Sequence, residues 1–244
     1  MQKNQLLKQF REVPKSKRII TALDLPTAEQ AVELAATLGD NGQFVKVGMQ
    51  LFTAAGPEVI TDLHETGRKI FLDLKYMDIP NTVAGGVRSA CGLGVSMLTL
   101  HASGGKRMME AAAQAASEYE NRAAILAVTV LTSFTLNELD EVAPGGGNMN
   151  DRIKRLATVS LEAGCDGLIC SPADLPAVRS AVGNEMLLIT PGVRPSGSAG
   201  DDQRRVATPK SAMTDGADYL VVGRPITKSN NPGIAIKTIA QELE

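Results

Sequence analysis

Charged side chains gather at the ends of three consecutive strand-like segments. Asp24 ends the first segment, Lys46 lies within the second, and the third, Lys69 to Lys75, contains Asp73 and leads to Asp78. Buried ions are costly unless they pair, so an alternating chain of lysines and aspartates is the tolerable arrangement. In such a chain the carboxylates keep each lysine protonated. A fixed ammonium is a positioned general acid that can deliver a proton to a carbanion.

The alternation of the third segment predicts which side chains share a face. With a side-chain period of two, Asp73 and Lys75 lie on one face, and Leu72 and Leu74 lie on the other. If the leucines pack under helices, the charged pair faces the interior. The alternative interpretation is a buried ion-pair network with no catalytic role. The charges lie at the ends of strands, where loops converge on one opening, and this position favours a catalytic site.

Two later loops have the composition of a phosphate-binding site. The first, Thr190 to Pro195, contains Pro191 and Arg194, and the second contains Gly223 and Arg224. Glycine lets backbone N–H groups approach a phosphate, and arginine supplies planar, charge-assisted donors. The long polar segment between the loops has the composition of a closing lid. The alternative interpretation of these loops is that they are proline-containing turns that carry two surface arginines.

Four other polar residues are weaker candidates. His101 ends the fourth strand-like segment and His64 lies in a helical one, a spacing that fits no known metal site. We therefore expect structural histidines and no metal. Thr132 and Ser133, at the expected end of the fifth strand, could hydrogen-bond a heterocycle or cap a turn.

The elements that must position these residues alternate between strand and helix along the whole chain. This alternation predicts a parallel sheet. Eight β/α units close naturally into a (β/α)8 TIM barrel, an α/β fold that we expect to form a single domain over residues 1–244. An open doubly wound sheet is the alternative, but no Gly-x-Gly-x-x-Gly follows the first strand. The expected strands are Ile19 to Asp24, Phe44 to Gly48, Lys69 to Lys75, Ser96 to His101, Ile125 to Leu131, Gly167 to Cys170, Leu187 to Thr190 and Tyr219 to Gly223.

Helical patterns lie between the expected strands, and glycines follow three of them where C-caps belong. Residues 1–17 form a separate short helical segment, whose apolar side chains we expect to pack across the bottom of the barrel. The expected barrel helices are Thr27 to Leu38, Ala54 to Glu65, Gly104 to Glu120 and Arg152 to Ala163, and the C-cap glycines are Gly39, Gly67 and Gly164.

Composition excludes several classes of protein. A net charge of -2 gives no general electrostatic reason to bind nucleic acid or an anionic membrane. No run of about 18 apolar residues is present, so we expect neither a membrane span nor a signal peptide. Cys91, Cys165 and Cys170 form no Cys-x-x-Cys motif and are typical of reduced packing residues in a cytoplasmic protein.

The third-strand motif Asp73-Leu-Lys75-Tyr-Met-Asp78-Ile-Pro-Asn-Thr82 resembles that of the orotidine 5'-phosphate decarboxylase family, bacterial type. Asp24, Lys46 and the two arginine loops agree, so the resemblance extends from about Arg18 to Thr227. It implies a carboxy-lyase that converts orotidine 5'-monophosphate to UMP and CO2 in de novo pyrimidine biosynthesis, without metal or organic cofactor.

The resemblance also implies residue roles. Lys75 protonates C6, and Asp73 lies beside the departing carboxylate. Lys46 joins the charge chain and, with Asp24, contacts the ribose hydroxyls. The remaining roles fall to three groups: Asp78, Ile79 and Thr82 reach the neighbouring site of a homodimer; Thr132 reads the pyrimidine; and Pro191, Arg194, Gln203, Gly223 and Arg224 bind the substrate at its phosphate end.

One departure and two alternatives remain. The family's lid usually reads Gly-Asp-Gln, whereas Gly200 to Gln203 reads Gly-Asp-Asp-Gln, which leaves the turn of the lid open. A related 3-keto-gulonate 6-phosphate decarboxylase or hexulose phosphate synthase would use magnesium, but Lys46 stands where those relatives carry a glutamate ligand. A non-catalytic sensor of phosphorylated ligands would not need the proton donor.

Overall fold

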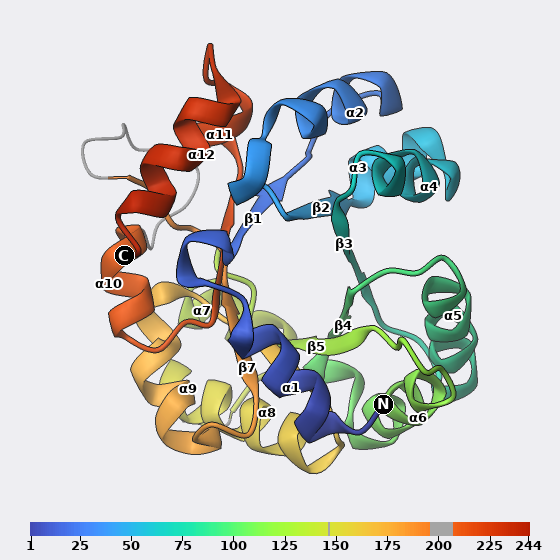
Figure 1. Ribbon diagram of the computed structural model, residues 1–244. Helices are drawn as coiled ribbons and strands as arrows, with labels where there is room; N and C mark the ends of the chain where they lie inside the picture. Colours follow the sequence, from blue (N-terminus) through green and yellow to red (C-terminus); the bar gives the residue numbers. More distant parts are fainter. Residues whose placement is uncertain (146, 196–206) are drawn as a thin grey trace.

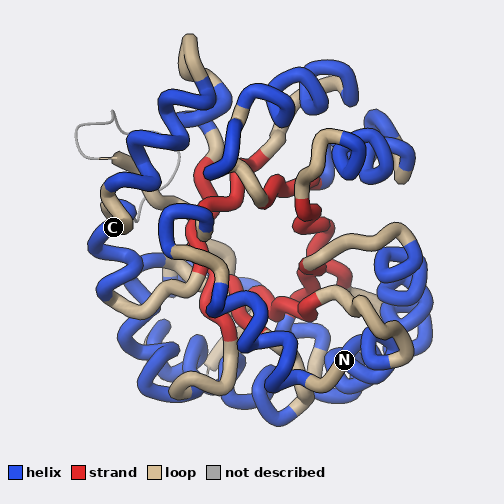
Figure 2. Tube along the Cα trace, in the orientation of Figure 1, coloured by secondary structure: helices blue, strands red, loops and turns tan. Residues whose placement is uncertain are grey.

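Short runs of aliphatic and β-branched residues form eight parallel strands, which pair in chain order and close on themselves. The computed structural model describes residues 1–145, 147–195 and 207–244. In Figure 2 the strands form an inner ring with helices outside it. This is the predicted (β/α)8 barrel. The strands are β1 (Ile19–Ala22), β2 (Phe44–Gly48), β3 (Lys69–Tyr76), β4 (Met97–His101), β5 (Ala124–Val128), β6 (Gly167–Ile169), β7 (Leu187–Thr190) and β8 (Tyr219–Val222).

Amphipathic helices cover the outside of the barrel (Figure 1). No helix in the described part of the chain is long and apolar enough to cross a membrane. The helices are α1 (Lys3–Glu12), α2 (Ala28–Thr37), α3 (Met49–Ala55), α4 (Glu58–Glu65), α5 (Pro80–Gly92), α6 (Lys106–Ser117), α7 (Leu136–Val142), α8 (Met149–Glu162), α9 (Leu175–Val182), α10 (Pro209–Thr214), α11 (Arg224–Thr227) and α12 (Pro232–Gln241).

Strand alternation divides the core into two layers. Side chains such as Phe44 and Phe71 belong to the cluster inside the barrel, whereas Val45, Ile70 and Leu72 belong to the larger cluster between strands and helices. Successive residues of a strand point to opposite faces, so each strand supplies both layers. The same alternation directs polar residues at the ends of the strands toward the barrel axis.

Helix α1 lies across one end of the barrel (Figure 1). Leu6, Leu7 and Phe10 are buried and belong to the interior cluster. The hydroxyl of Tyr219 in β8 donates a hydrogen bond of 2.8 Å to the carbonyl of Phe10. Because α1 covers the amino-terminal ends of the strands, the carboxyl ends form the open mouth.

Several expected elements begin or end at other residues in the structure, and the reason is visible for one helix and one strand. The expected helix from Ala54 to Glu65 is split into α3 and α4, because Gly56 adopts a φ of 67° and Pro57 follows it. The fifth strand ends at Val128 rather than Leu131. Its partner β6 ends at Ile169, which pairs with Val128, so no further residue of β6 is available for pairing. The three glycines predicted at helix C-caps all have positive φ, as that position requires.

Candidate active site

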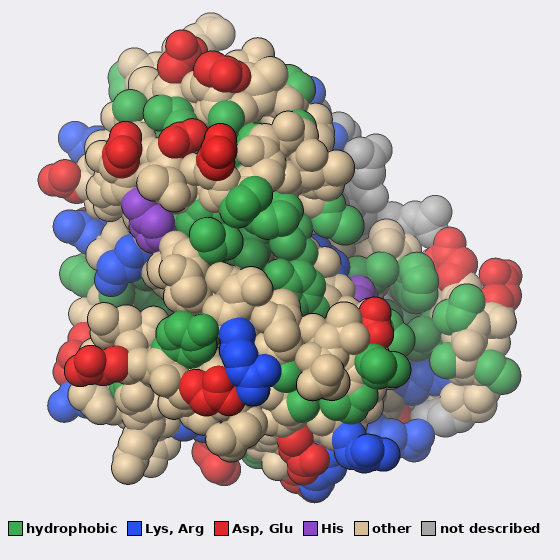
Figure 3. Space-filling model, turned by 90° about the vertical axis from the view of Figure 1, so that its right-hand side faces the viewer, with side chains coloured by type: hydrophobic (Ala, Val, Ile, Leu, Met, Phe, Trp, Pro, Cys, Tyr) green, Lys and Arg blue, Asp and Glu red, His purple; other side chains and the backbone are tan. Residues whose placement is uncertain are grey.

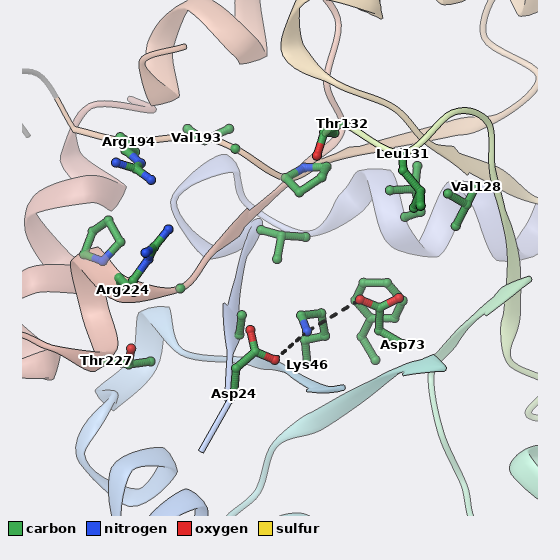
Figure 4. A pocket seen from close by; sticks show the side chains of 18 of the residues that line it. Asp24, Lys46, Asp73, Val128, Leu131, Thr132, Val193, Arg194, Arg224 and Thr227 are labelled. Atoms are coloured by element: carbon green, nitrogen blue, oxygen red, sulfur yellow. Dashed lines mark hydrogen bonds and ion pairs between the residues drawn. The ribbon is translucent and has the colours of Figure 1, made fainter. Parts of the chain in front are cut away.

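A cavity of about 590 Å³ opens at the carboxyl ends of the strands (Figure 4). One wall is made by β1, β2 and β3, and the opposite wall by the loops that follow β7 and β8. In a β/α barrel these ends are where the loops converge, so side chains distant in sequence meet at one mouth. The predicted charged residues and the predicted phosphate loops therefore share one pocket.

Lys46, Asp73 and Lys75 form a continuous chain of alternating charge. The Lys46 Nζ lies 3.5 Å from Asp73 Oδ2, and the Lys75 Nζ donates to Asp73 Oδ1 at 2.8 Å. On its other side the Lys46 Nζ donates to Asp24 Oδ1 at 2.9 Å. The Asp73 side chain is 13% exposed, whereas that of Asp24 is 58% exposed at the mouth. Figure 4 shows the row from Asp24 through Lys46 to Asp73.

Asp73 is ionised despite its burial. Burial alone would raise the pKa of its carboxyl, but the ammonium groups of Lys46 and Lys75 and the hydrogen bonds from Lys75 and Thr99 outweigh burial and lower it. The site thus holds a fixed anion between two cations.

Asp78 does not join this row of alternating charges. Its side chain is exposed in the turn between β3 and α5, and its carboxylate accepts from the Ile79 N–H at 2.6 Å. Ile79 is 67% exposed, and Thr82 in the first turn of α5 is also exposed. These three residues are not among those lining the pocket of their own chain.

The two arginine loops form the far wall of the pocket. Pro191, Arg194, Gly223 and Arg224 all line it. In Figure 4, Arg194 and Arg224 lie together on the side opposite Asp73. Arg194 is 8% exposed, and its backbone N–H donates to the carbonyl of Ala207 at 3.0 Å. A phosphate here would be separated from Lys75 by the length of the cavity.

The predicted lid lies outside the described residues. This applies to Gln203 and to the whole Gly200–Gln203 sequence, which falls within 196–206.

Thr132 lines the pocket together with Val128 and Leu131, on the side across from the charged row (Figure 4). It lies in the loop after β5 rather than at the end of the strand. The combination of two apolar side chains and one hydroxyl suits a flat ring that carries polar edges.

The two histidines have different surroundings. Burial and the ammonium of Lys75 lower the pKa of His101, against an opposing effect of Asp73. The Nδ1 of His64 lies 3.2 Å from the carbonyl oxygen of Arg68. Within residues 1–145, 147–195 and 207–244, no three His, Cys, Asp or Glu side chains gather as a metal site would require.

Sequence reasoning missed two residues that shape the site. A Cβ on Gly48 would lie 2.9 Å from both Asp24 Oδ1 and Lys46 Nζ, so a side chain there would displace this ion pair. Thr99 of β4 hydrogen-bonds both Asp73 and the backbone of Lys75. Its position two residues before His101 on an alternating strand marked it as an interior polar residue.

This combination defines a class: a (β/α)8-barrel enzyme with a lysine–aspartate chain at its mouth and a two-arginine wall facing it. A family model described as orotidine 5'-phosphate decarboxylase / HUMPS family matches residues 17–239. The chain belongs to this family.

Known proteins of similar sequence and structure support this family assignment. A protein from Halorhodospira halophila named orotidine 5'-phosphate decarboxylase is 48% identical over 95% of this chain and 98% of its own length. One of the same name from Nitrosospira multiformis is 44% identical over 93% of this chain and 94% of its own. The crystal structure of orotidine 5'-phosphate decarboxylase from Lactobacillus acidophilus superposes with a TM-score of 0.84 at 38% identity, covering 93% of this chain and 99% of that one.

Proposed function

We propose that this protein decarboxylates orotidine 5'-monophosphate to UMP and CO2, with Lys75 as the proton donor. The observation that carries the proposal is the Lys75 Nζ held 2.8 Å from Asp73 Oδ1 on the wall of a cavity. The names of the relatives support the substrate, and the opposed arginines suit its phosphate.

The reaction requires a positive charge close to the carbon that loses CO2. As the bond from C6 to the carboxylate breaks, its electron pair stays on C6, and the Lys75 ammonium transfers a proton there. The fixed ammonium stabilises developing negative charge without reorganising in the transition state. Asp73 holds the ammonium in place and repels the substrate carboxylate, whose charge disappears as CO2 leaves.

The other predicted residues bind the rest of the nucleotide in this proposal. Asp24 and Lys46 contact the ribose, because their ion pair lies between the reacting end and the arginine wall. Thr132 contacts the pyrimidine edge. Pro191, Arg194, Gly223 and Arg224 bind at the phosphate end, and Gln203 is assigned there from the resemblance alone. Phosphate binding remote from C6 then contributes to the rate of the chemical step.

Lys46 favours this reaction over magnesium-dependent chemistry of the same family. Its Nζ lies between Asp24 and Asp73, at 2.9 and 3.5 Å from their oxygens. A divalent cation bound by these carboxylates would have to lie beside that ammonium, which would repel it. We therefore expect turnover without an added metal or organic cofactor.

We further propose a homodimer in which Asp78, Ile79 and Thr82 reach the neighbouring active site. These residues are exposed and do not line the pocket of their own chain. Met49 and Met77, 59% and 57% exposed, lie in α3 and beside Asp78. Figure 3 shows hydrophobic side chains gathered at the centre of the face on which α3, α4 and α5 lie. Such a patch is typical of a protein interface.

We propose the cytoplasm as the location of this enzyme. Cys91, Cys165 and Cys170 are free and buried, in keeping with a reducing compartment.

The reaction is tested by the change in ultraviolet absorbance as orotidine 5'-monophosphate becomes UMP. We expect turnover by the wild-type protein that persists in EDTA, and its loss in Lys75→Ala. Equal signals from the two proteins would exclude Lys75 as the proton donor. A strict requirement for magnesium would overturn the cofactor-independent reaction.

The shared site is tested by mixing two inactive variants, Lys75→Ala and Asp78→Ala. A hybrid dimer with shared sites has one site that carries both changes and one that carries neither, so mixing restores activity. If Asp78 served its own chain, every site of the hybrid would carry one change. Mixtures that stay inactive, although differently tagged subunits copurify as hybrid dimers, would then contradict the sharing.

A further inference from the structure

The pairing of β3 with β4 is interrupted at the candidate active site. Phe71 pairs with Met97 and Leu72 with Leu98, but the next pair joins Tyr76 to Leu100. Three residues of β3, 73 to 75, therefore lie opposite Thr99 alone. Such a bulge breaks the ladder and leaves backbone groups that must find other partners.

A single hydroxyl replaces the missing ladder bond. The backbone N–H of Lys75 donates to Thr99 Oγ1 at 2.9 Å, and Thr99 Oγ1 donates to Asp73 Oδ1 at 2.9 Å. Thr99 is fully buried, so water does not compete for these bonds. The Thr99 hydroxyl has one proton to donate, and one of its lone pairs already accepts the hydrogen bond from the Lys75 N–H. The proton is therefore directed to Asp73.

The backbone that this hydroxyl holds is in an unusual conformation. Lys75 has a φ of 51°, and among the described residues it is the one non-glycine residue with positive φ. The left-handed region is unfavourable for a residue with a Cβ, because the Cβ lies too close to the following carbonyl oxygen. Strain of this kind persists where surrounding contacts enforce it, and it clusters at functional sites. The bond from the Lys75 N–H to Thr99 is one such contact.

We infer that Thr99 is a positioning residue for the reaction proposed above, fixing the Lys75 backbone and the Asp73 carboxylate with one hydroxyl. Thr99 is not among the residues that line the pocket, so it acts through these two neighbours. The Oδ1 of Asp73 receives both the Thr99 hydroxyl and the Lys75 ammonium. Loss of the hydroxyl lets the carboxylate rotate and the bulge relax, and the ammonium moves away from the position of C6.

Two matched pairs of variants isolate the hydroxyl. Thr99→Val replaces it with a methyl group of similar size, and Thr99→Ser retains it. Thr99→Ala differs from Thr99→Ser by the hydroxyl alone, which keeps the test available if the valine variant does not fold. We expect kcat to fall about 100-fold in the valine and alanine variants, the size expected for one misplaced preorganised group. In Thr99→Ser we expect kcat within a few-fold of wild type.

The split between kcat and KM separates positioning from a general loss of structure. We expect the KM for orotidine 5'-monophosphate and the affinity for UMP to stay within a few-fold of wild type, because the ribose and phosphate contacts are untouched. We also expect the acidic limb of the kcat/KM profile to move to higher pH without the hydroxyl, because Asp73 loses a donor to its ionised form. A kcat in Thr99→Val or Thr99→Ala equal to that of Thr99→Ser would overturn the inference.

A crystal structure of Thr99→Val, or of Thr99→Ala, keeps this test separate from that of the proposed function. If wild-type protein turns over no orotidine 5'-monophosphate, the proposed function fails, and the geometry then decides the role of Thr99. We expect Lys75 to leave the left-handed region or its Nζ to separate from Asp73. Unchanged geometry at both residues contradicts the inference, whatever the substrate.

Discussion

The two ends of the barrel both bury charges, but they satisfy them differently. At the closed end, the Arg122 guanidinium makes two bonds of 2.7 Å to Asp166, whose Oδ2 also accepts from the Ile125 N–H. Asp218 similarly accepts from Arg179 and from the Leu188 N–H, each at 2.9 Å. These carboxylates join strands to one another.

At the open end, the charges face a cavity instead. Lys46 and Lys75 line it, and Asp73 holds the ammonium groups of both, with Asp24 as the second partner of Lys46. Charges saturated by protein partners stabilise the fold, whereas charges held toward a cavity remain able to act on a ligand. The difference predicts that changes at the open end reduce activity and that changes at the closed end reduce stability.

Replacement of Lys75 by methionine is expected to have the largest effect. It removes the ammonium, so kcat should fall about 10⁴-fold, the upper range for a general acid. The matched control is Lys69→Met on the same strand, whose exposed Nζ lies 5.5 Å from the Phe44 ring centre at the closed end. Steady-state kinetics should show wild-type turnover in the control. Equal losses of kcat in the two variants would contradict the proposed difference between the open and closed ends of the barrel.

Asp166→Asn tests the closed end. Asp166 is fully buried, and the change leaves the Arg122 charge without a counter-ion. Breaking a buried pair costs about 3–5 kcal/mol of unfolding free energy. Urea denaturation measures that loss, while kcat of the folded protein should equal that of wild type. A lower kcat without a loss of stability would show that the closed end contributes to the chemistry.

Phe10→Ala tests whether α1 belongs to the same cooperative unit as the barrel. The Phe10 ring lies 6.1 Å from that of Phe44 and 5.9 Å from that of Tyr219. We propose that residues 1–244 unfold as one domain, so removal of this ring should lower its unfolding free energy by about 3 kcal/mol. The matched control is Val142→Ala at a 71% exposed position of α7. Two separate thermal transitions in the wild-type protein would contradict a single domain.

The pH dependence of stability should show the smallest effect. The pKa of Asp73 in the folded protein lies below its ordinary value of 3.8. A carboxyl group with a lowered folded pKa stabilises the fold at pH values above the unfolded pKa, and this contribution disappears as the pH falls through the folded pKa. Below pH 3.8, wild type should therefore lose stability more steeply than Asp73→Asn. Parallel curves from denaturation at several pH values would show that Asp73 is not held in its ionised form.

The sequence by itself determined the features that depend on local spacing. A period of two placed Asp73 and Lys75 on the face opposite Leu72 and Leu74, and the structure puts both leucines against the helix layer. Eight alternating elements predicted the barrel, and a barrel of parallel strands places the loops that follow its strands at one mouth. The sequence alone therefore predicts that the charged row and the arginine wall share one pocket.

The tertiary structure alone decided how Thr99 meets Asp73 and Lys75. That contact depends on three residues of β3 facing one residue of β4, and a register shift leaves no periodic trace in either strand. The Arg122–Asp166 pair likewise joins residues 44 positions apart. Local patterns specify which face a side chain occupies, because backbone geometry repeats every two residues in a strand. Which side chains touch across strands depends on packing of the whole barrel, which is a nonlocal property of the chain.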